Sequence, residues 1–444
     1  MSSLADIFWA ERVAVVGASA TPGKTGYNIL RNILEGGFRG QVFPVNPRGG
    51  EILGQRVYTS LSEIPGDVDL VVVVIPAAGV PAVLKEAAAK HARGAVVISG
   101  GFREAGNEEL ERELVRVARE GGVRIIGPNC QGLNYTPNRL CASWPLITRS
   151  GPMAVISQSG TVAAAVAGWA EEEGVGISGC VALGNRCDVN EVELAAFFAD
   201  DPATRAVAVY VEGVADGRAF VEVGRRLAGK KGLVVLSPGR TEKGARAAQS
   251  HTRSLAGSHE VFRGVCRQVR AVLAEDTEQL YDFAKAFALV SRPLGPRLMV
   301  VTSSGGSGIL ATDVAEMSGL KVFDLEPEHR RVLADVLPPH CVISNPLDLT
   351  GDADAERYRA AVLAARDIGV DTFLLVFGDP IPGAAEVVKF LRAQVPQEIF
   401  VSCLGGGEVG RDEAARMLAA GVPVYPTPER AVRAIAAVYR WQQG

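Results

Sequence analysis

The chain has five histidines, and one of them, His251, lies in a segment of mostly small, hydroxyl and cationic residues from Gly239 to Gly257. Small residues leave room for a ligand, and hydroxyl and cationic side chains can hold a phosphate. These neighbours therefore fit a histidine in a mobile loop that accepts a phosphoryl group. They also fit an ordinary histidine of a surface loop, so the residues alone leave both interpretations of His251 open.

A phosphorylated imidazole needs nearby hydrogen-bond donors and a group that orients the ring. Ser159, Gly160 and Thr161 occupy a tight turn between a predicted strand and a predicted helix, where N–H groups and the helix dipole favour an anion. Glu212 ends another predicted strand and can orient an imidazole by accepting its second N–H. A strand-end carboxylate is also common as a structural feature, so the spacing assigns Glu212 no role.

The N-terminal region contains a second set of residues suited to binding a nucleotide-like ligand. A glycine-rich loop follows the predicted strand 13–16 and precedes a predicted helix. This loop is longer than the G-x-G-x-x-G fingerprint of NAD-binding folds. Its candidate ligand contacts are Gly17, Ser19, Thr21, Gly23 and Lys24.

The end of the next predicted strand, 42–45, narrows the choice of ligand. NAD-binding folds place an Asp or Glu there to hold the ribose hydroxyls, whereas this chain has Asn46, Pro47 and Arg48. A cation suits a ribose phosphate, which is the 2′-phosphate of NADP or the 3′-phosphate of coenzyme A. Arg48 is also compatible with a solvated surface position.

Three further turns follow predicted strands of the same region. Open α/β sheets bind ligands at the carboxyl ends of their parallel strands, which is where these turns lie. No neighbour of Cys130 is of a type that lowers the pKa of a thiol, so we expect Cys130 to contact a ligand rather than to act as a nucleophile. The candidate contacts in the three turns are Pro76, Ser99, Gly100, Asn129 and Cys130.

A repeated pattern of β-branched runs, small-residue turns and amphipathic helices must position these residues. Continuous apolar strands alternating with helices predict an α/β fold with parallel sheets covered on both faces. The pattern predicts a Rossmann-like domain at 1–150 and two doubly wound, flavodoxin-like domains at 151–290 and 291–444, with a linker at the start of the third. The third domain repeats the anion-type turn at 303–308.

Composition excludes several classes of protein. The 444 residues are 48% hydrophobic and 22% charged with a formal net charge of −4, and the absence of a Lys/Arg-rich tract makes nucleic acid an unexpected partner. The sequence has no signal segment and no apolar run of membrane-spanning length, which predicts a cytoplasmic protein without a membrane partner. Seven cysteines without a C-x-x-C pair predict neither disulfides nor a metal site.

Together these segments resemble the α chain of ADP-forming (NDP-forming) acyl-CoA synthetases, the acetate–CoA ligase type in the succinyl-CoA synthetase superfamily. The resemblance spans nearly the whole chain in the family's order. It is carried by V-V-G-A-S-A-T-P-G-K-T-G from Val15, V-F-P-V-N-P-R from Val42, G-P-N-C-Q-G from Gly127, I-S-Q-S-G-T from Ile156, L-G-N-R-C-D-V from Leu183, Y-V-E-G from Tyr210, S-H-T-R-S-L-A-G from Ser250 and N-P-L-D-L-T-G from Asn345.

The resemblance implies that coenzyme A binds to the first domain, through the loop 17–26, Arg48 and the turn 99–102. It implies that His251 is phosphorylated, with Glu212 as its carboxylate partner and the turn 159–161 around the phosphate. The implied reaction is reversible. Phosphate converts an acyl-CoA to an acyl phosphate and free coenzyme A, and the phosphoryl group then passes through histidine to ADP.

The resemblance also implies a partner. Fused members of the family continue into an ATP-grasp region that binds ADP or ATP with magnesium, whereas this chain ends after one more α/β domain. We therefore expect a separate ATP-grasp β subunit, in an αβ or α2β2 assembly. Succinyl-CoA synthetases have an aromatic residue at the position of Ala164, so acetate or a bulkier monocarboxylic acid is expected rather than succinate.

Departures from the family pattern leave other functions open. Arg253 stands where the family usually has Gly, the strand end 236–239 lacks the Lys of many relatives, and Ser303 with Ser304 replaces the usual Asn-Ala. A long cationic side chain at 253 can stabilise phosphate or obstruct movement of the histidine segment. The alternatives are a catalytically inactive protein that binds CoA or acyl-CoA and, from Arg48, an NADP-dependent oxidoreductase.

Overall fold

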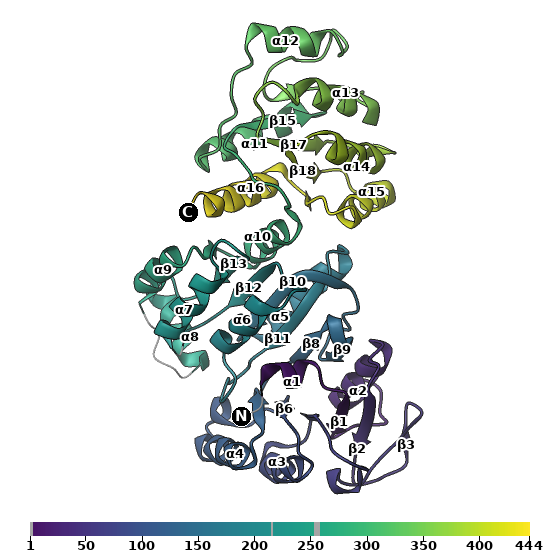
Figure 1. The fold of residues 1–444 in the computed structure, drawn as a ribbon, viewed down its shortest axis with the longest axis vertical. Helices are drawn as coiled ribbons and strands as arrows, with labels where there is room; N and C mark the ends of the chain where they lie inside the picture. Colours follow the sequence, from purple (N-terminus) through teal and green to yellow (C-terminus); the bar gives the residue numbers. More distant parts are fainter. Residues whose placement is uncertain (1–2, 215, 253–257) are drawn as a thin grey trace. The chain divides into compact units, whose positions relative to one another are not determined.

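A computed structural model of the chain describes residues 3–214, 216–252 and 258–444, and for 248–252 it describes the course of the main chain alone. The chain divides into two compact units. Unit 1 comprises residues 1–172 and 176–280, and unit 2 comprises residues 173–175 and 281–444. Figure 1 shows the helices and strands of both.

Unit 1 begins with a five-stranded parallel sheet of order β2-β1-β5-β6-β7. Its central strands are continuous runs of buried, mostly β-branched residues, as expected when helices cover both faces. The strands are β1 (Arg12–Val16), β2 (Gln41–Val45), β5 (Leu70–Val73), β6 (Gly94–Val97) and β7 (Arg124–Ile126), and β3 (Glu51–Ile52) pairs with β4 (Gln55–Arg56) in a separate hairpin. The helices are α1 (Leu4–Phe8), α2 (Thr25–Glu35), α3 (Val80–Ala89) and α4 (Glu108–Gly121), with short 3-10 turns at Leu61–Glu63, Ala77–Gly79 and Arg103–Ala105.

A second sheet completes unit 1, in the order β14-β13-β12-β10-β11-β8-β9. The antiparallel hairpin of β8 and β9 extends its edge beyond β11. The sequence does not predict this hairpin, because the prolines from 128 to 152 indicate an irregular exit from the first domain. The strands are β8 (Gly132–Tyr135), β9 (Leu140–Ala142), β10 (Ser150–Ser157), β11 (Ile177–Ala182), β12 (Ala206–Tyr210), β13 (Gly232–Leu236) and β14 (Val272–Ala274), and the helices are α5 (Gly160–Glu172), α6 (Glu191–Asp200), α7 (Gly217–Leu227), α8 (Glu242–Thr252) and α9 (His259–Gln268), with a 3-10 turn at Thr136–Asn138.

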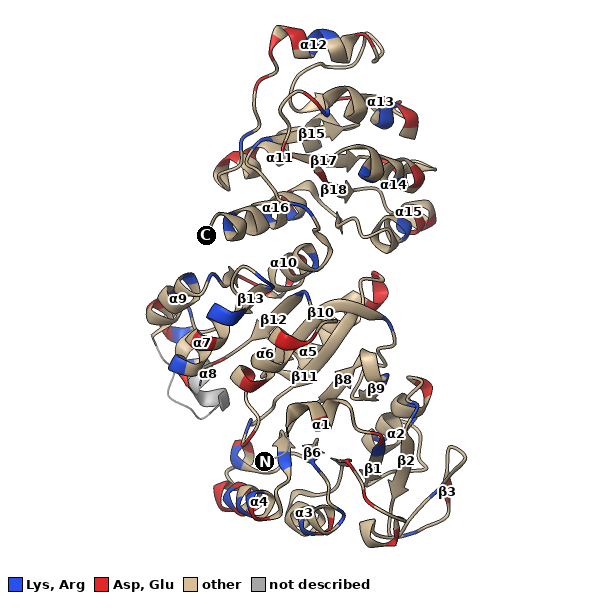
Figure 2. Ribbon diagram, in the orientation of Figure 1, with Lys and Arg blue, Asp and Glu red and all other residues tan. Residues whose placement is uncertain are grey.

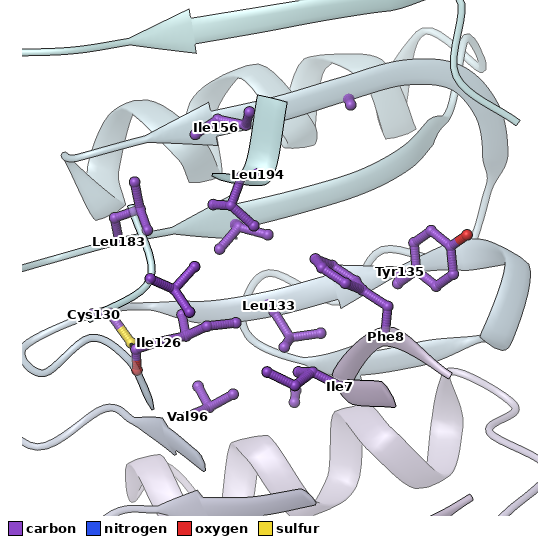
Figure 3. Close-up of a cluster of buried hydrophobic side chains, with 14 of the residues drawn as sticks. Ile7, Phe8, Val96, Ile126, Cys130, Leu133, Tyr135, Ile156, Leu183 and Leu194 are labelled. Carbon is purple, nitrogen blue, oxygen red and sulfur yellow. The ribbon is translucent and has the colours of Figure 1, made fainter. Parts of the chain in front are cut away.

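One hydrophobic core joins the two sheets of unit 1. Side chains from α1, β6 and β7 pack with side chains from β8, β10 and α6 (Figure 3). Phe8 of α1 stacks on Phe197 with ring centroids 4.3 Å apart and meets Tyr135 edge-on at 5.1 Å. Because interiors are close-packed, this continuous core holds the loops of the first sheet in fixed positions relative to those of the second.

Unit 2 contains a five-stranded parallel sheet of order β16-β15-β17-β18-β19. α11 packs with α16, and α13, α14 and α15 form a second layer of helices (Figure 1). The predicted linker at 291–296 is packed, since the N–H groups of Ser291 and Arg292 donate to Oε2 of Glu398 at 2.9 and 3.0 Å. The strands are β15 (Leu298–Thr302), β16 (Leu347–Asp348), β17 (Thr372–Phe377), β18 (Glu398–Cys403) and β19 (Val424–Tyr425), and the helices are α10 (Thr277–Leu289), α11 (Gly305–Met317), α12 (Pro327–Ala334), α13 (Ala355–Ala365), α14 (Ala384–Gln394), α15 (Gly407–Ala419) and α16 (Pro428–Gln443).

All three parallel arrays share one strand order when strands are counted along the chain: second, first, third, fourth, fifth. In this doubly wound order, the ends of the first and third strands border the crevice in which ligands bind. In unit 1 these ends are Val16 and Val73 in the first sheet, and Ser157 and Tyr210 in the second. The predicted α/β class is confirmed. The glycine loop, Pro76, the turn 159–161 and Glu212 follow these four strand ends, whereas the candidate segments with Arg48, Ser99 and Asn129 follow β2, β6 and β7.

The segment around His251 differs from the prediction. The sequence predicts a loop over 239–257, whereas the main chain forms helix α8 up to Thr252. Alanines of this segment are strong helix formers, and Glu242 pairs with Arg246 one turn later at 3.5 Å. His251 therefore lies in the last turn of α8, while its side chain and Arg253 lie outside the described residues.

Charged side chains of opposite sign are interspersed on the helices (Figure 2). On α4, for example, Arg112 pairs with Glu109 at 2.8 Å and Arg116 pairs with Glu120 at 2.9 Å. None of the helices in the part of the chain that the structure describes has both the length and the apolar character needed to cross a membrane.

Gly17 provides a test of the packing at the end of β1, because it has a φ of +91° and an added Cβ would lie 2.2 Å from the carbonyl oxygen of Val74. We expect Gly17→Ala to lower the free energy of unfolding by about 3 kcal/mol or more, since the clash is with the main chain. Gly122→Ala is the matched control, because Gly122 has a φ of +69° but open space around an added Cβ. It should lower the free energy by only about 1 kcal/mol, measured by urea unfolding. Equal losses would contradict the close approach at Gly17.

Candidate active site

The turn from β10 into α5 is closed by the hydroxyl of the last strand residue, Ser157. Its Oγ donates to the carbonyl oxygen of Ser159 at 2.6 Å and accepts from the N–H of Ser159 at 3.1 Å. α5 begins at Gly160, and Thr161 is exposed in its first turn. Because the first N–H groups of a helix have no partner within it, this turn offers donors to an anion at the carboxyl edge of the second sheet.

Close packing requires glycine at position 160. A Cβ there would lie 2.8 Å from Oε1 of Gln131 and 3.1 Å from its Cβ. Gln131 is buried, and its amide donates to the carbonyl oxygen of Trp144. A larger residue at 160 would displace this buried amide or the start of α5.

Glu212 lies two residues beyond β12 and is connected to this turn. Its N–H donates to Oε1 of Gln158 at 2.8 Å, and its half-buried carboxylate accepts from the hydroxyl of Tyr210 at 3.3 Å. Burial, and then the charge of Glu212, raises the pKa of Tyr210 to about 12, so the phenol keeps its proton and remains a donor. The structure therefore brings Glu212 and the turn 159–161 together.

Three polar residues for which the sequence predicts no individual role form a network beside the Glu212 segment. They are Gln158, Arg186 and Glu191. Nη1 of Arg186 lies 2.9 Å from both carboxylate oxygens of Glu191. A signal for Glu191 was present, because this acid begins a helix that is mostly apolar. No local pattern indicates which partner that acid meets.

The main chain of His251 lies on the connection after β13, and Glu212 lies on the connection after the neighbouring strand β12. β13 neighbours β12, and α8 follows β13. The side chain of His251 lies outside the described residues, so its predicted role stays a prediction. The described geometry supplies the two groups that an imidazole would need, which are helix N–H donors and a carboxylate.

The glycine loop of the first sheet leads from β1 into α2. Oγ of Ser19 accepts from the N–H of Thr21 at 3.1 Å, which shapes the loop after Gly17. Lys24 is the N-cap residue of α2, and its side chain makes no capping hydrogen bond. Gly23 and Lys24 are exposed, so the N–H groups at the start of α2 are accessible to a ligand.

Asn46 holds the end of β2 against this loop. Its Nδ2 donates to the carbonyl oxygen of Ala18 at 2.9 Å, and its Oδ1 accepts from the N–H of Arg48 at 3.0 Å. The exposed Arg48 is therefore positioned beside the glycine loop. A cation near the start of a helix fits a ligand with more than one phosphate.

The other turns of the first sheet are fastened to one another through Ser99. Its Oγ accepts from the N–H of Ile75 at 3.2 Å, and its carbonyl oxygen accepts from the N–H of Asn129 at 2.9 Å. A Cβ on Gly100 would lie 3.0 Å from Oδ1 of Asn129. Pro76, Gly100 and Asn129 are exposed, whereas Ser99 is buried. The exposed residues are therefore available to a ligand, and Ser99 orders the turns that carry them.

The thiol of Cys130 lies in the shared core of unit 1 (Figure 3). It is 7% exposed and donates to the carbonyl oxygen of Val97 at 3.3 Å. Burial raises the pKa of Cys130 to about 12. Because the thiolate is the reactive form, this environment disfavours nucleophilic chemistry at Cys130.

Asn185 connects the turn 99–102 to the second sheet. Its Nδ2 donates to the carboxylates of Glu104 and Glu111, and Glu104 also accepts from the N–H of Phe102 at 3.1 Å. Burial acts to raise the pKa of Glu104, but the hydrogen bonds outweigh it and hold the pKa below the ordinary value. An ionised Glu104 therefore orders this turn. Through Asn185, the turn is also hydrogen-bonded to the chain that follows β11 of the second sheet.

Three known domain families match consecutive parts of the chain. A CoA binding domain matches residues 11–136. The succinyl-CoA ligase like flavodoxin domain matches residues 150–287, and a Ligase-CoA domain matches residues 298–444.

Relatives and a solved structure are similar to the chain over its full length. It is 40% identical to the alpha subunit of ADP-forming acetate–CoA ligase I of Pyrococcus furiosus, over 99% of this chain and 98% of that protein. It is 40% identical to ADP-forming acetate–CoA ligase I of Archaeoglobus fulgidus, over 98% of this chain but 63% of that longer protein. The dinucleotide forming acetyl-coenzyme A synthetase 1 of Ca. Korarchaeum cryptofilum, in complex with phosphate and ADP, matches with a TM-score of 0.91 at 37% identity, over 100% of this chain and 97% of that chain.

A CoA-binding α/β domain followed by a flavodoxin domain of the succinyl-CoA ligase type defines a class of acyl-CoA ligases. Within that class, the chain belongs to the family of α subunits of ADP-forming acetate–CoA ligases. The resemblance seen in the sequence, the ligase class and the involvement of coenzyme A and ADP are thereby confirmed.

The buried thiol of Cys130 generates a prediction about reactivity. With the pKa of Cys130 raised to about 12, we expect the native protein to resist alkylation of this residue by iodoacetamide at about pH 8. The same residue should react readily in urea, and Cys130→Ala should keep enzymatic turnover. Mass spectrometry of each cysteine measures the labelling. Rapid native labelling of Cys130 would show that the thiol is not buried as described.

Proposed function

We propose that this chain is the α subunit of an enzyme that reversibly converts acyl-CoA, phosphate and ADP to a carboxylic acid, coenzyme A and ATP. A phosphate oxygen attacks the thioester carbonyl, the C–S bond breaks, and coenzyme A leaves as an acyl phosphate forms. The imidazole of His251 then attacks phosphorus, and the carboxylate leaves with the bridging oxygen. A terminal oxygen of ADP finally takes the phosphoryl group, and the P–N bond to His251 breaks.

One observation carries this proposal. The helix-start turn at 159–161 and the Glu212 segment lie at the switch point of the second sheet and are joined through Gln158, whose Oε1 accepts from the N–H of Glu212. The turn supplies N–H donors for phosphate charge. Glu212 can accept from one ring nitrogen of His251, which selects the tautomer and leaves the other nitrogen free to attack.

The first domain is the proposed site of coenzyme A. The N–H groups at the start of α2 and the exposed Lys24 suit the pyrophosphate of coenzyme A. The neighbouring Arg48 suits the 3′-phosphate. Pro76, Gly100 and Asn129 lie on the adjoining turns of the same edge and can contact the rest of the coenzyme. The hydrophobic core shared by the two sheets supports a fixed distance between this proposed site and the turn 159–161, where the thioester would meet phosphate.

A small monocarboxylic acid is the proposed acyl substrate. The similar proteins from Pyrococcus furiosus and Archaeoglobus fulgidus are named acetate–CoA ligases. Ala164 lies half-buried in α5, one turn beyond the phosphate turn, and its small side chain adds little bulk near the reacting carbon. Acetate is therefore the first substrate to test, followed by bulkier monocarboxylic acids.

The proposed enzyme needs a second polypeptide for the nucleotide. The chain spans 63% of the Archaeoglobus fulgidus ligase, and the Pyrococcus furiosus relative is named a subunit alpha. The matching partner is an ATP-grasp β subunit that binds ADP or ATP with magnesium, in an αβ or α2β2 assembly. Family membership leaves no support for the alternative of an NADP-dependent oxidoreductase.

Phosphorylation of His251 tests the proposed function. The α chain with its β subunit, incubated with radioactive phosphate and acetyl-CoA, should acquire an acid-labile, base-stable label. His251→Ala should abolish the label. Glu212→Gln should slow its appearance by roughly 100- to 10,000-fold, because an amide lacks the negative charge and can donate to the ring, which favours the wrong tautomer. Arg253→Gly is a control that restores the family's usual residue and should keep the label.

The outcomes separate the proposal from its alternative. Labelling of His251→Ala at the wild-type rate would refute the phosphohistidine mechanism. A wild-type chain that binds coenzyme A but never becomes labelled would support the catalytically inactive CoA-binding protein instead.

The role proposed for Arg48 is tested by two ligands that differ in one phosphate. We expect Arg48→Met to weaken binding of coenzyme A about tenfold, a loss of ~1.4 kcal/mol, and to leave binding of 3′-dephospho-coenzyme A unchanged. Arg56→Met is the control, because Arg56 lies in the same domain with its guanidinium 5.1 Å from the ring centroid of Tyr58. Titration calorimetry measures the affinities. Equal weakening for both ligands would place the 3′-phosphate elsewhere.

A further inference from the structure

Gln158 joins the phosphate turn to the Glu212 segment by three hydrogen bonds. Its main-chain N–H donates to the carbonyl oxygen of Tyr210 at 3.1 Å. Its side-chain amide then bridges the next part of the chain, because Oε1 accepts from the N–H of Glu212 at 2.8 Å and Nε2 donates to the carbonyl oxygen of Gly213 at 2.9 Å. Gln158 is buried, so these bonds are protected from competing water.

A buried ion pair holds the carbonyl group of Gly213 from a second direction. Nη1 of Arg186 donates to that oxygen and lies 2.9 Å from the carboxylate of Glu191, whose side chain is 0% exposed. Nε2 of Gln158 also reaches Glu191 at 3.3 Å. A buried carboxylate is stable only when it is paired and hydrogen-bonded, and the start of α6 adds a favourable helix dipole. Gln158 and Arg186 therefore share one anchor, Glu191.

The main chain adopts an unfavourable conformation where it places Arg186. The φ of Arg186 is +48°, in the left-handed region that non-glycine residues rarely occupy. Gly184, two residues earlier, has a φ of +54°, and a Cβ there would lie 2.2 Å from the carbonyl oxygen of Asn129. Strain of this kind persists only where surrounding contacts enforce it and is concentrated at functional sites. Its position here motivates a functional role for Arg186.

Unit 2 repeats the turn without this network. Thr302, which matches Ser157 in position, donates from Oγ1 to the carbonyl oxygen two residues later at 3.0 Å and accepts from the N–H there at 2.9 Å. Ser303 takes the place of Gln158, and its Oγ accepts from the N–H of Gly378 at 3.1 Å, at the position that Glu212 has in unit 1. The turn therefore forms without a long amide or a buried ion pair. The network of Gln158, Arg186 and Glu191 therefore occurs beside the turn that has a carboxylate, Glu212, at this position.

We infer that Gln158, Arg186 and Glu191 are positioning residues, which hold Glu212 where its carboxylate orients the imidazole of His251. The inference rests on the proposed phosphohistidine function. These residues hold the N–H of Glu212 and the carbonyl oxygen of Gly213 by hydrogen bonds. The main chain that carries the Glu212 side chain is therefore fixed in position. Misplacement of a reacting group by about 1 Å can lower a rate about 100-fold, which makes such a restraint effective.

Gln158→Ala tests the inference, because it removes both side-chain bonds to the Glu212 segment. We expect phosphorylation of His251 in the reconstituted enzyme to be about 10- to 100-fold slower, with unchanged affinity for coenzyme A. Gln158→Ser, which copies Ser303 of unit 2, should recover part of the rate. The double variant Gln158→Ala/Glu212→Gln should match Glu212→Gln alone within about threefold, because Gln158 acts through Glu212.

Ser178→Ala is the matched control for loss of a buried hydrogen bond. Ser178 is buried near the start of β11, at the amino ends of the parallel strands and so away from the turn 159–161, with its Oγ 2.7 Å from Oγ1 of Thr204. It should lower the melting temperature and leave the phosphorylation rate unchanged.

Two results would overturn the inference. One is a wild-type phosphorylation rate in Gln158→Ala, and the other is a double variant in which the two single effects multiply, as independent defects do. Failure to label His251 in the wild-type enzyme would instead overturn the proposed function, so the two failures are distinguishable.

Discussion

A phosphoryl group carries concentrated negative charge, and a protein that transfers it must hold this charge while the group changes partners. Main-chain N–H groups at the start of a helix provide donors that are already in place. In the second sheet these donors depend on Ser157, whose hydroxyl closes the turn, and on Gly160, which leaves room for the amide of Gln131. Gln158, the residue just before this turn's Ser159, also joins it to the segment that carries Glu212.

The doubly wound fold explains how two candidate ligand sites come to lie in one compact unit. Each sheet opens its crevice at the ends of its first and third strands, and a single hydrophobic core joins the two sheets of unit 1. Asn185 adds a polar connection, because it donates to Glu104 in the first sheet's turn and precedes Arg186, which holds the Glu212 segment.

Unit 2 shows that the fold alone does not supply the chemistry. Its β15–α11 turn closes with a threonine hydroxyl as the β10–α5 turn closes with a serine hydroxyl, yet Gly378 stands where unit 1 has Glu212. Function resides in side chains added to a common scaffold. In unit 1 these additions include an acid and a buried polar network that the turn itself does not need.

The sequence by itself determined the α/β class and predicted three domains and the candidate turns, since apolar strands and small-residue turns are local patterns. It also identified Glu212 and the turn 159–161, which the structure brings together. The sequence did not predict the hairpin of β8 and β9, because the position of the hairpin depends on pairing with β11. It did not predict α8 either, because glycine and serine near the alanines of this segment indicated a loop. Only the tertiary structure decided that Gln158, Arg186 and Glu191 meet. Their partners lie on separate connections, and a buried charge is stable only where folding supplies its counterpart.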